Sequence, residues 1–103
     1  MADFRLAFPM RPSEGFRIGV DFSRVMEEGD TATSQSITAT DKNGASVTGT
    51  FLTQPAVTSA GLAKVKLVKN IATSALSPYT VRFHIGTAQG DDFERTYEVL
   101  VRD

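Results

Sequence analysis

The residues of this sequence that could do chemistry are one histidine and two groups of carboxylates. His84 is the only histidine, and the chain has no cysteine. It therefore lacks the clustered imidazole and thiolate ligands that a zinc site needs. A serine–histidine–aspartate triad would have to use His84, but no nucleophile-elbow sequence accompanies it. We expect His84 to be an ordinary surface residue, and we predict no enzymatic activity, no cofactor and no metal.

Two short segments hold neighbouring carboxylates. Asp91 and Asp92 follow a glycine in a predicted hairpin loop, and residues 27–30 form a second acidic turn. Calcium requires several oxygen ligands, so two neighbouring aspartates are only the beginning of a site. Both segments are therefore interpreted as solvated turns.

Three of the basic residues are lysines in one strand region. Lys64, Lys66 and Lys69 occur close together, and Arg82 and His84 are expected nearby. Lysines on the outer face of a strand commonly prevent edge-to-edge aggregation; contact with an acidic partner surface is the alternative. The net charge of -1 and the absence of interleaved aromatic residues argue against nucleic-acid binding. The candidate interaction surface comprises Lys64, Lys66, Arg82, His84, Asp91 and Asp92.

Strands must position these side chains, because apolar and polar residues alternate along much of the chain. Alternation is strict over residues 16–22 and returns over 79–86 and 93–102. A period of two predicts strands with one buried and one solvated face. No segment carries a sustained helical pattern, so the fold class is all-β.

Weaker signals predict the remaining elements. Residues 1–12 alternate from Phe4 and are then interrupted by prolines, which predicts an edge strand or an extended arm. Ser23–Glu28 has room for one helical turn with Ser23 as its N-cap. Strands are also predicted over 31–40, 45–51 and 63–68. Asn43-Gly44 predicts a turn, and Gln54-Pro55 a loop.

About seven short strands separated by turns predict an immunoglobulin-like antiparallel β-sandwich. The predicted core shares the inward parity of these strands. It consists of Phe16, Ile18, Val20, Phe22, Ile37, Val47, Phe51, Val65, Leu67, Val81, Phe83, Ile85, Tyr97, Val99 and Val101.

The last two strands are predicted to form an antiparallel hairpin. The favoured register places Phe83 opposite Tyr97 and Arg82 opposite Glu98. A two-residue slip keeps every side chain on the same face and places His84 opposite Glu94 instead. Tyr79, at the start of this hairpin, is either a simple core residue or the tyrosine corner of an immunoglobulin-like sandwich.

The chain is long enough for one domain with its own core. It has 103 residues, 41% of them apolar, and a domain of about 100 residues buries roughly two-thirds of its unfolded surface. No run approaches the ~20 apolar residues of a membrane span, and the N-terminus lacks a signal-peptide pattern. The absence of cysteine is typical of a reducing cytoplasm. We expect a single domain over residues 1–103, and the start at Met1 indicates a whole gene product.

Four stretches carry a resemblance to a known group of proteins: Val20–Ser23, Glu28–Ser34, Tyr79–Ile85 and Thr87–Arg102. Through them, the sequence from Gly15 onwards resembles small immunoglobulin-like proteins of tailed phages and prophages. These proteins are encoded among virion morphogenesis genes and serve as neck, tail or fibre-adaptor components. Two departures occur. Phe22 stands where these proteins often have tryptophan, and Ala88–Asp92 stands where they often have Gly-Gly-Arg-Thr.

The resemblance implies a non-enzymatic structural or assembly module of a phage or prophage virion. Such a protein would be made in the bacterial cytoplasm and then enter the virion. Its partners would be other virion or tail proteins, and not nucleic acid or a membrane. Binding would use exposed loops or strands, since an open sheet edge can pair with a partner strand. The alternative function is an immunoglobulin-like recognition module that binds carbohydrate or a host-surface protein.

Overall fold

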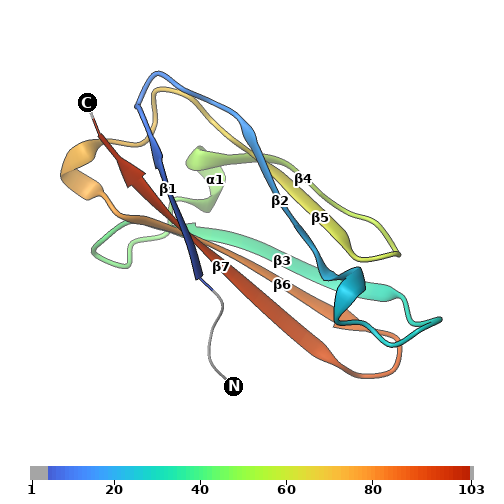
Figure 1. Cartoon of the computed structure of the whole chain (residues 1–103). Helices are drawn as coiled ribbons and strands as arrows, with labels where there is room; N and C mark the ends of the chain where they lie inside the picture. The colour runs from blue at the N-terminus through green and yellow to red at the C-terminus, as the bar shows by residue number, and fades with distance from the viewer. Residues whose placement is uncertain (1–4, 103) are drawn as a thin grey trace.

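The computed structural model describes residues 5–102. Seven strands form two sheets, and Figure 1 shows that the sheets pack face to face. The strands are β1 (Arg5–Met10), β2 (Arg17–Asp21), β3 (Ala32–Thr40), β4 (Leu52–Val57), β5 (Leu62–Leu67), β6 (Tyr79–Thr87) and β7 (Asp92–Val101). Three short helical segments connect them: η1 (Phe22–Arg24), α1 (Thr48–Phe51) and η2 (Ser74–Leu76). The predicted all-β sandwich is confirmed.

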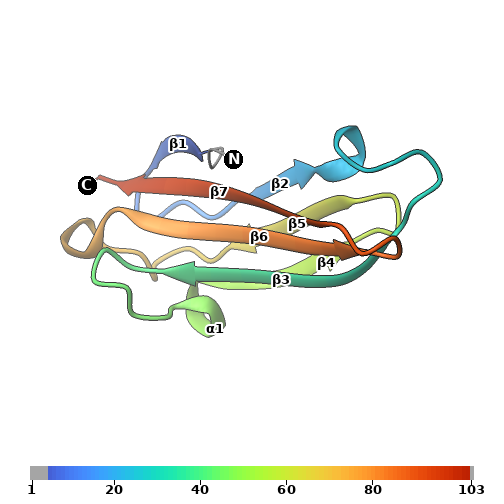
Figure 2. The same ribbon diagram turned by 90° about the horizontal axis from the view of Figure 1, so that it is seen from below.

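The strand order is that of an immunoglobulin-like sandwich. One sheet has the order β1-β7-β6-β3 and the other the order β2-β5-β4 (Figure 2). Lettered A to G along the chain, the strands pair as B-E-D and C-F-G, as in constant-type immunoglobulin domains. β1 differs, because it joins the C-F-G sheet, where it pairs parallel to β7.

β1 is an edge strand, one of the two forms expected for the N-terminal segment. Its residues from Arg5 to Met10 pair with those from Thr96 to Val101. Pro9 has no N–H to donate, and an edge position accommodates proline for that reason. Phe4, where the predicted alternation begins, lies outside the described residues.

The central strands bury their predicted inward residues almost completely. The predicted core residues that are buried are Phe22, Phe51, Val65, Leu67, Val81, Phe83, Ile85, Val99 and Val101. Those only partly buried are Phe16, Ile18, Val20, Ile37, Val47 and Tyr97. Several of these lie on or beside the edge strands β2 and β3, which have a neighbouring strand on one side only.

The core also contains residues that the alternation did not predict. They are Met10, Ala39, Leu52, Ala63 and Ala72, while the buried Tyr79 confirms one of the two alternatives given for that residue. Three of them are alanines, whose small side chains carry a weak hydrophobic signal. Tyr79 is 1% exposed, and its hydroxyl accepts a hydrogen bond from the backbone N–H of Thr73 at 3.0 Å. It is therefore both a core residue and a tyrosine corner, because its hydroxyl holds the connection before β6.

The prediction of a strand over residues 45–51 is wrong. The predicted turn does form, with Gly44 at a φ of +82°, but only one isolated bridge, between Thr40 and Ser46, follows it. The chain then leaves the sheet of β3 and forms the short helix α1, in which the Phe51 N–H donates to Val47 O at 2.8 Å. This helix carries the chain from one sheet to the other.

The next strand begins later than predicted, at Leu52, and includes the segment predicted to be a loop. β4 pairs with β5, and its register shifts between Thr53 and Ala56. Gln54 has a φ of +53°, which is uncommon outside glycine and marks this irregularity. Pro55 is accommodated because β4 is an edge strand.

The helical turn predicted after β2 is present, but its cap differs. η1 starts at Phe22, and Asp21 is the N-cap in place of Ser23. One carboxylate oxygen of Asp21 accepts hydrogen bonds from the N–H and the hydroxyl of Ser23, at 3.0 and 2.6 Å. These bonds lower the pKa of Asp21.

The β6–β7 hairpin has the predicted parity, but the favoured register is wrong by two residues. Ile85 pairs with Phe93, and Phe83 pairs with Arg95 in place of Tyr97. The hairpin closes over a tight turn in which the Thr87 N–H donates to Asp91 O at 2.9 Å. The alternative that places His84 opposite Glu94 is the observed register.

Candidate interaction surfaces

The six residues of the predicted interaction surface lie on opposite sides of the molecule. Lys64 and Lys66 belong to β5, whose intervening residues are buried, so both lysines point outward from the three-stranded sheet. Arg82 and His84 alternate with buried residues of β6, so they point outward from the four-stranded sheet. The expectation that these two pairs lie near each other is wrong, because the sandwich core separates them.

Four cationic residues lie on the outer side of the three-stranded sheet, and we call them the cationic face: Arg17, Lys64, Lys66 and Lys69. Asp21, which shares the outward parity of Arg17, is an exposed carboxylate at the other end of β2. Arg17 pairs directly with Lys66 across β2 and β5. Lys64 lies two residues from Lys66 on the same face of β5, and Lys69 follows the strand. In the described part of the chain, no carboxylate lies within ion-pair distance of these lysines. The Arg17 guanidinium donates to the neutral Oε1 of Gln54 at 2.8 Å.

The position of β5 changes the interpretation of its lysines. Outward lysines protect a sheet when they lie on an edge strand. β5 is the central strand of its sheet, paired with β2 on one side and β4 on the other. Lys64 and Lys66 therefore lie on no free edge, and the interpretation as edge protection does not hold for them.

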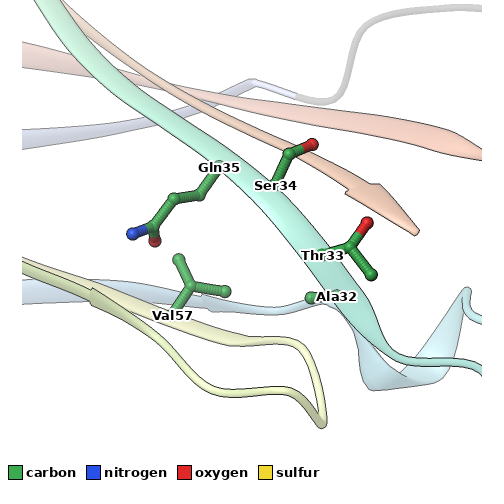
Figure 3. Close-up of a pocket in the computed structure, with 5 residues that line it drawn as sticks. All are labelled: Ala32, Thr33, Ser34, Gln35 and Val57. Carbon is green, nitrogen blue, oxygen red and sulfur yellow. The ribbon is translucent and has the colours of Figure 1, made fainter. Parts of the chain in front are cut away.

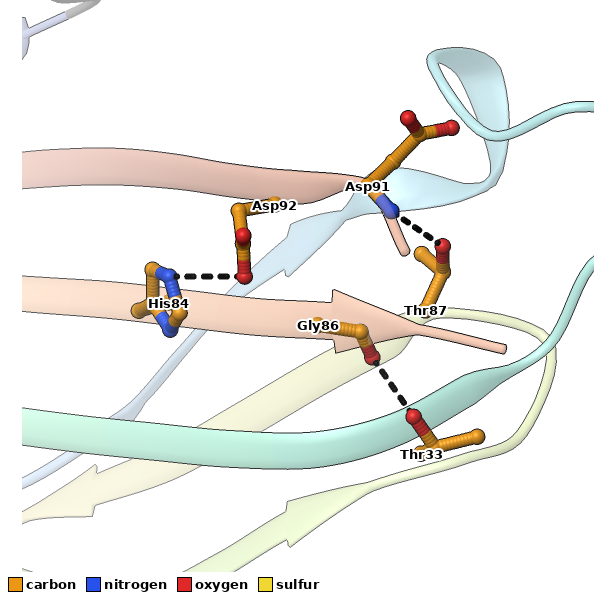
Figure 4. A network of polar contacts seen from close by, with 6 residues as sticks. All are labelled: Thr33, His84, Gly86, Thr87, Asp91 and Asp92. Atoms are coloured by element: carbon orange, nitrogen blue, oxygen red, sulfur yellow. Dashed lines mark hydrogen bonds and ion pairs between the residues drawn. The ribbon is translucent and has the colours of Figure 1, made fainter. Parts of the chain in front are cut away.

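On the outer side of the four-stranded sheet, Arg82 and His84 each lie beside a carboxylate. The Arg82 guanidinium lies 3.3 Å from a carboxylate oxygen of Glu94. His84 Nε2 lies 3.4 Å from Asp92 Oδ1, as Figure 4 shows. These groups are exposed by 39–70%. Exposed ion pairs of this kind contribute at most about 1 kcal/mol to the stability of the fold. His84 faces outward, as predicted from its parity.

The two acidic segments meet at one end of the sandwich. One carboxylate oxygen of Asp30 accepts hydrogen bonds from the N–H groups of Thr31 and Gln89, at 2.9 and 3.2 Å. Burial raises the pKa of Asp30, but hydrogen bonding by Thr87 and by these backbone amides outweighs it, so the pKa is lowered. Asp30 thereby ties the β2–β3 connection to the β6–β7 hairpin.

The hairpin at this end is fixed by further polar contacts. The Asp91 N–H donates to Thr87 Oγ1 at 3.1 Å, and the Thr33 hydroxyl donates to Gly86 O at 3.3 Å (Figure 4). We call this end the acidic tip and define it as Glu27, Glu28, Asp30, Asp91 and Asp92.

The β3 edge offers unpaired backbone groups to solvent. On an antiparallel edge strand, alternate residues direct their N–H and C=O away from the neighbouring strand. The backbone groups of Ala39 face away from β6: its N–H donates to Thr48 Oγ1 at 3.0 Å, and its C=O accepts from the Val47 N–H at 2.9 Å. Counting back by two, the backbone groups of Ile37 and Gln35 face the same way. No group in the described residues pairs with them.

A shallow pocket adjoins this open edge. It lies between β3 and β4, and Figure 3 shows the side chains of Gln35 and Val57 pointing toward one another across it. Ala32, Thr33 and Ser34 complete its lining. Residues 31–40 contain no charged residue and no proline. That absence was a visible sequence signal of an unprotected edge, and the predicted interaction surface did not include it.

The described residues do not hold a group of three or more histidines, carboxylates or thiols placed to bind a metal ion. Within that same part of the chain, no helical segment has the length and apolar character of a membrane span. The chain matches no protein-family model, and no curated protein matches it at a significant level.

Proposed function

We propose that this chain is a non-enzymatic structural or assembly module of a phage or prophage virion, of the neck, tail or fibre-adaptor type. The sequence resemblance suggests the particle. The observation that carries a binding role is the open β3 edge, where the backbone groups of Gln35 and Ile37 have no partner among the described residues. Strand addition at such an edge is a recurring mode of protein recognition.

The length of the open edge limits the partner strand. At one end, Val47 and Thr48 occupy the edge beside Ala39. At the other end, the Ala32 N–H donates to Ser59 O at 2.9 Å. A partner can therefore pair only with the residues between these two positions. A short extended segment of another virion protein fits this space.

The particle itself provides the test. Virions are induced from a bacterium that carries the gene, purified on a density gradient and analysed by quantitative mass spectrometry. We expect the chain at a fixed copy number per particle, and incomplete particles when its gene is deleted. Normal infectious particles that lack the chain would refute the proposal. Binding of the purified protein to glycans or host surface, without incorporation, would favour the recognition module.

The role of the edge has its own variant. The Gln35 N–H faces outward, so Gln35→Pro removes a free donor without breaking a bond to β6. We expect Gln35→Pro to fold but to be lost from particles, whereas Gln35→Ala, which keeps the donor, is incorporated. Circular dichroism confirms that both variants are folded.

A further inference from the structure

The cationic face carries a charge arrangement that costs stability. Arg17 and Lys66 are direct cross-strand partners on the same side of the sheet. Like charges directly opposite each other in a sheet destabilise it. No carboxylate of the described chain lies within ion-pair distance of Lys64, Lys66 or Lys69 to offset this repulsion. The arrangement is favourable when an anionic group lies on the face.

The backbone beneath the face is shaped around these side chains. Gly19 is the cross-strand partner of Lys64. A Cβ atom at position 19 would lie 2.8 Å from Ala63 O and 3.3 Å from the Lys64 Cγ, so only glycine fits without displacement. Hydrogen bonding on both sides of β5 fixes the register of its lysines.

The chain itself carries a surface of complementary charge. At the acidic tip, Glu27, Glu28 and Asp91 are exposed, and their carboxylates have no ion-pair partner in the described residues. Arg17 and Lys66 lie at the far end of their strands from this tip, because Asp21 and Leu62 are the residues nearest to it. The tip therefore cannot cover the whole cationic face of its own copy.

We propose that the cationic face of one copy binds the acidic tip of a second copy. The two surfaces differ, so the contact is heterologous, and repeating it joins copies into a ring or an open series. A nucleic acid fits less well, since no aromatic side chain lies on the face for base stacking and the acidic tip repels phosphates. This contact uses a different surface from the β3 edge and does not depend on the virion assignment.

Sedimentation velocity over a concentration series tests the contact. We expect the wild-type protein to self-associate at low ionic strength and to dissociate as salt is added, because exposed charges are screened within about 10 Å at 0.1 M salt. Lys64→Glu/Lys66→Glu and Glu27→Lys/Glu28→Lys should each weaken association by at least about tenfold. Mixing these two variants should restore it between unlike copies.

A matched control is available on the same chain. Lys42→Glu/Arg102→Glu makes the same change in net charge as Lys64→Glu/Lys66→Glu, at exposed residues outside both surfaces, and it should associate like the wild type. Thermal unfolding checks that every variant is folded. A wild type that stays monomeric over the whole series would overturn the proposal. So would equal weakening in the control pair, or a mixture that fails to recover association.

Discussion

Replacing Phe83 by alanine should be the most damaging simple change in the core. Phe83 is fully buried, and it lies on β6, which has neighbouring strands on both sides. Its ring meets that of Tyr97 edge to face, with 5.8 Å between centroids. Truncating such a side chain loses its transfer free energy and leaves a cavity, at a cost of about 3–5 kcal/mol. Domains of this kind have total stabilities of about 5–15 kcal/mol.

Thermal and urea unfolding monitored by circular dichroism would measure this loss. For a domain of this length, each kcal/mol lowers Tm by roughly 4–8 °C, so Phe83→Ala should lose at least about 12 °C or fail to fold. Phe93→Ala is the matched control, because Phe93 lies on the same hairpin but is only partly buried. The Tm of Phe93→Ala should fall clearly less than that of Phe83→Ala. A Tm for Phe83→Ala within a degree or two of the wild type would refute the inward parity of β6.

Three further changes probe polar groups. Tyr97→Phe removes the 2.6 Å hydrogen bond from the Tyr97 hydroxyl to Gly19 O, which links the two sheets. Urea unfolding should show a loss of about 0.5–1.5 kcal/mol in the free energy of unfolding. An unchanged midpoint would contradict this expectation. The lowered pKa of Asp30 means that its carboxylate stabilises the fold above the ordinary pKa near 3.8, and that this contribution is lost as pH falls through the folded-state value. Asp30→Asn should therefore be less stable than the wild type at pH 7, with a gap that narrows at pH 3; a constant gap would count against the assignment. His84→Ala should leave fold and function intact, and a transition metal bound at His84 in the native protein, seen by anomalous scattering, would disprove that expectation.

Alternation predicted most of the strands because successive side chains of a strand point to opposite faces, so burial of one face recurs at every second residue. Strands β6 and β7 are long and largely alternating, and their inward residues from Val81 to Ile85 and from Val99 to Val101 are buried as expected. The same rule could not choose between registers of the hairpin. A two-residue slip preserves parity, so the turn at Thr87–Asp91 decides the register, and the pattern of hydrophobicity does not.

The failure at residues 45–51 has a different cause. Val47 and Phe51 do contact the core, so their apolar character was interpreted correctly. Their spacing of four residues also suits one turn of helix, which the chain uses to cross between sheets. The choice depends on tertiary connection, and a short segment carries no signal of that connection.

The sequence predicted which side chains of the candidate surfaces face outward, but not which of them share a side of the molecule. Parity showed that Lys64, Lys66, Arg82 and His84 face outward, because side-chain direction is a local property. It could not show that the first two lie on the opposite side of the molecule from the last two. It also could not show that β5 is a central strand. Both facts depend on strand order, which is set by contacts distant in sequence.

The four sheet edges show where a partner strand can bind. β1 contains Pro9, and β4 contains Pro55 and a shifted register, so both edges resist strand addition.

At the middle of the β2 edge, the Tyr97 hydroxyl already donates a hydrogen bond to Gly19 O, so this acceptor is not free for a partner strand. β3 is the longest edge strand and carries neither proline nor charge. An edge left open in this way exposes the protein to aggregation unless a partner covers it. With three protected edges and one unprotected edge, β3 is the edge at which the proposed partner strand would bind.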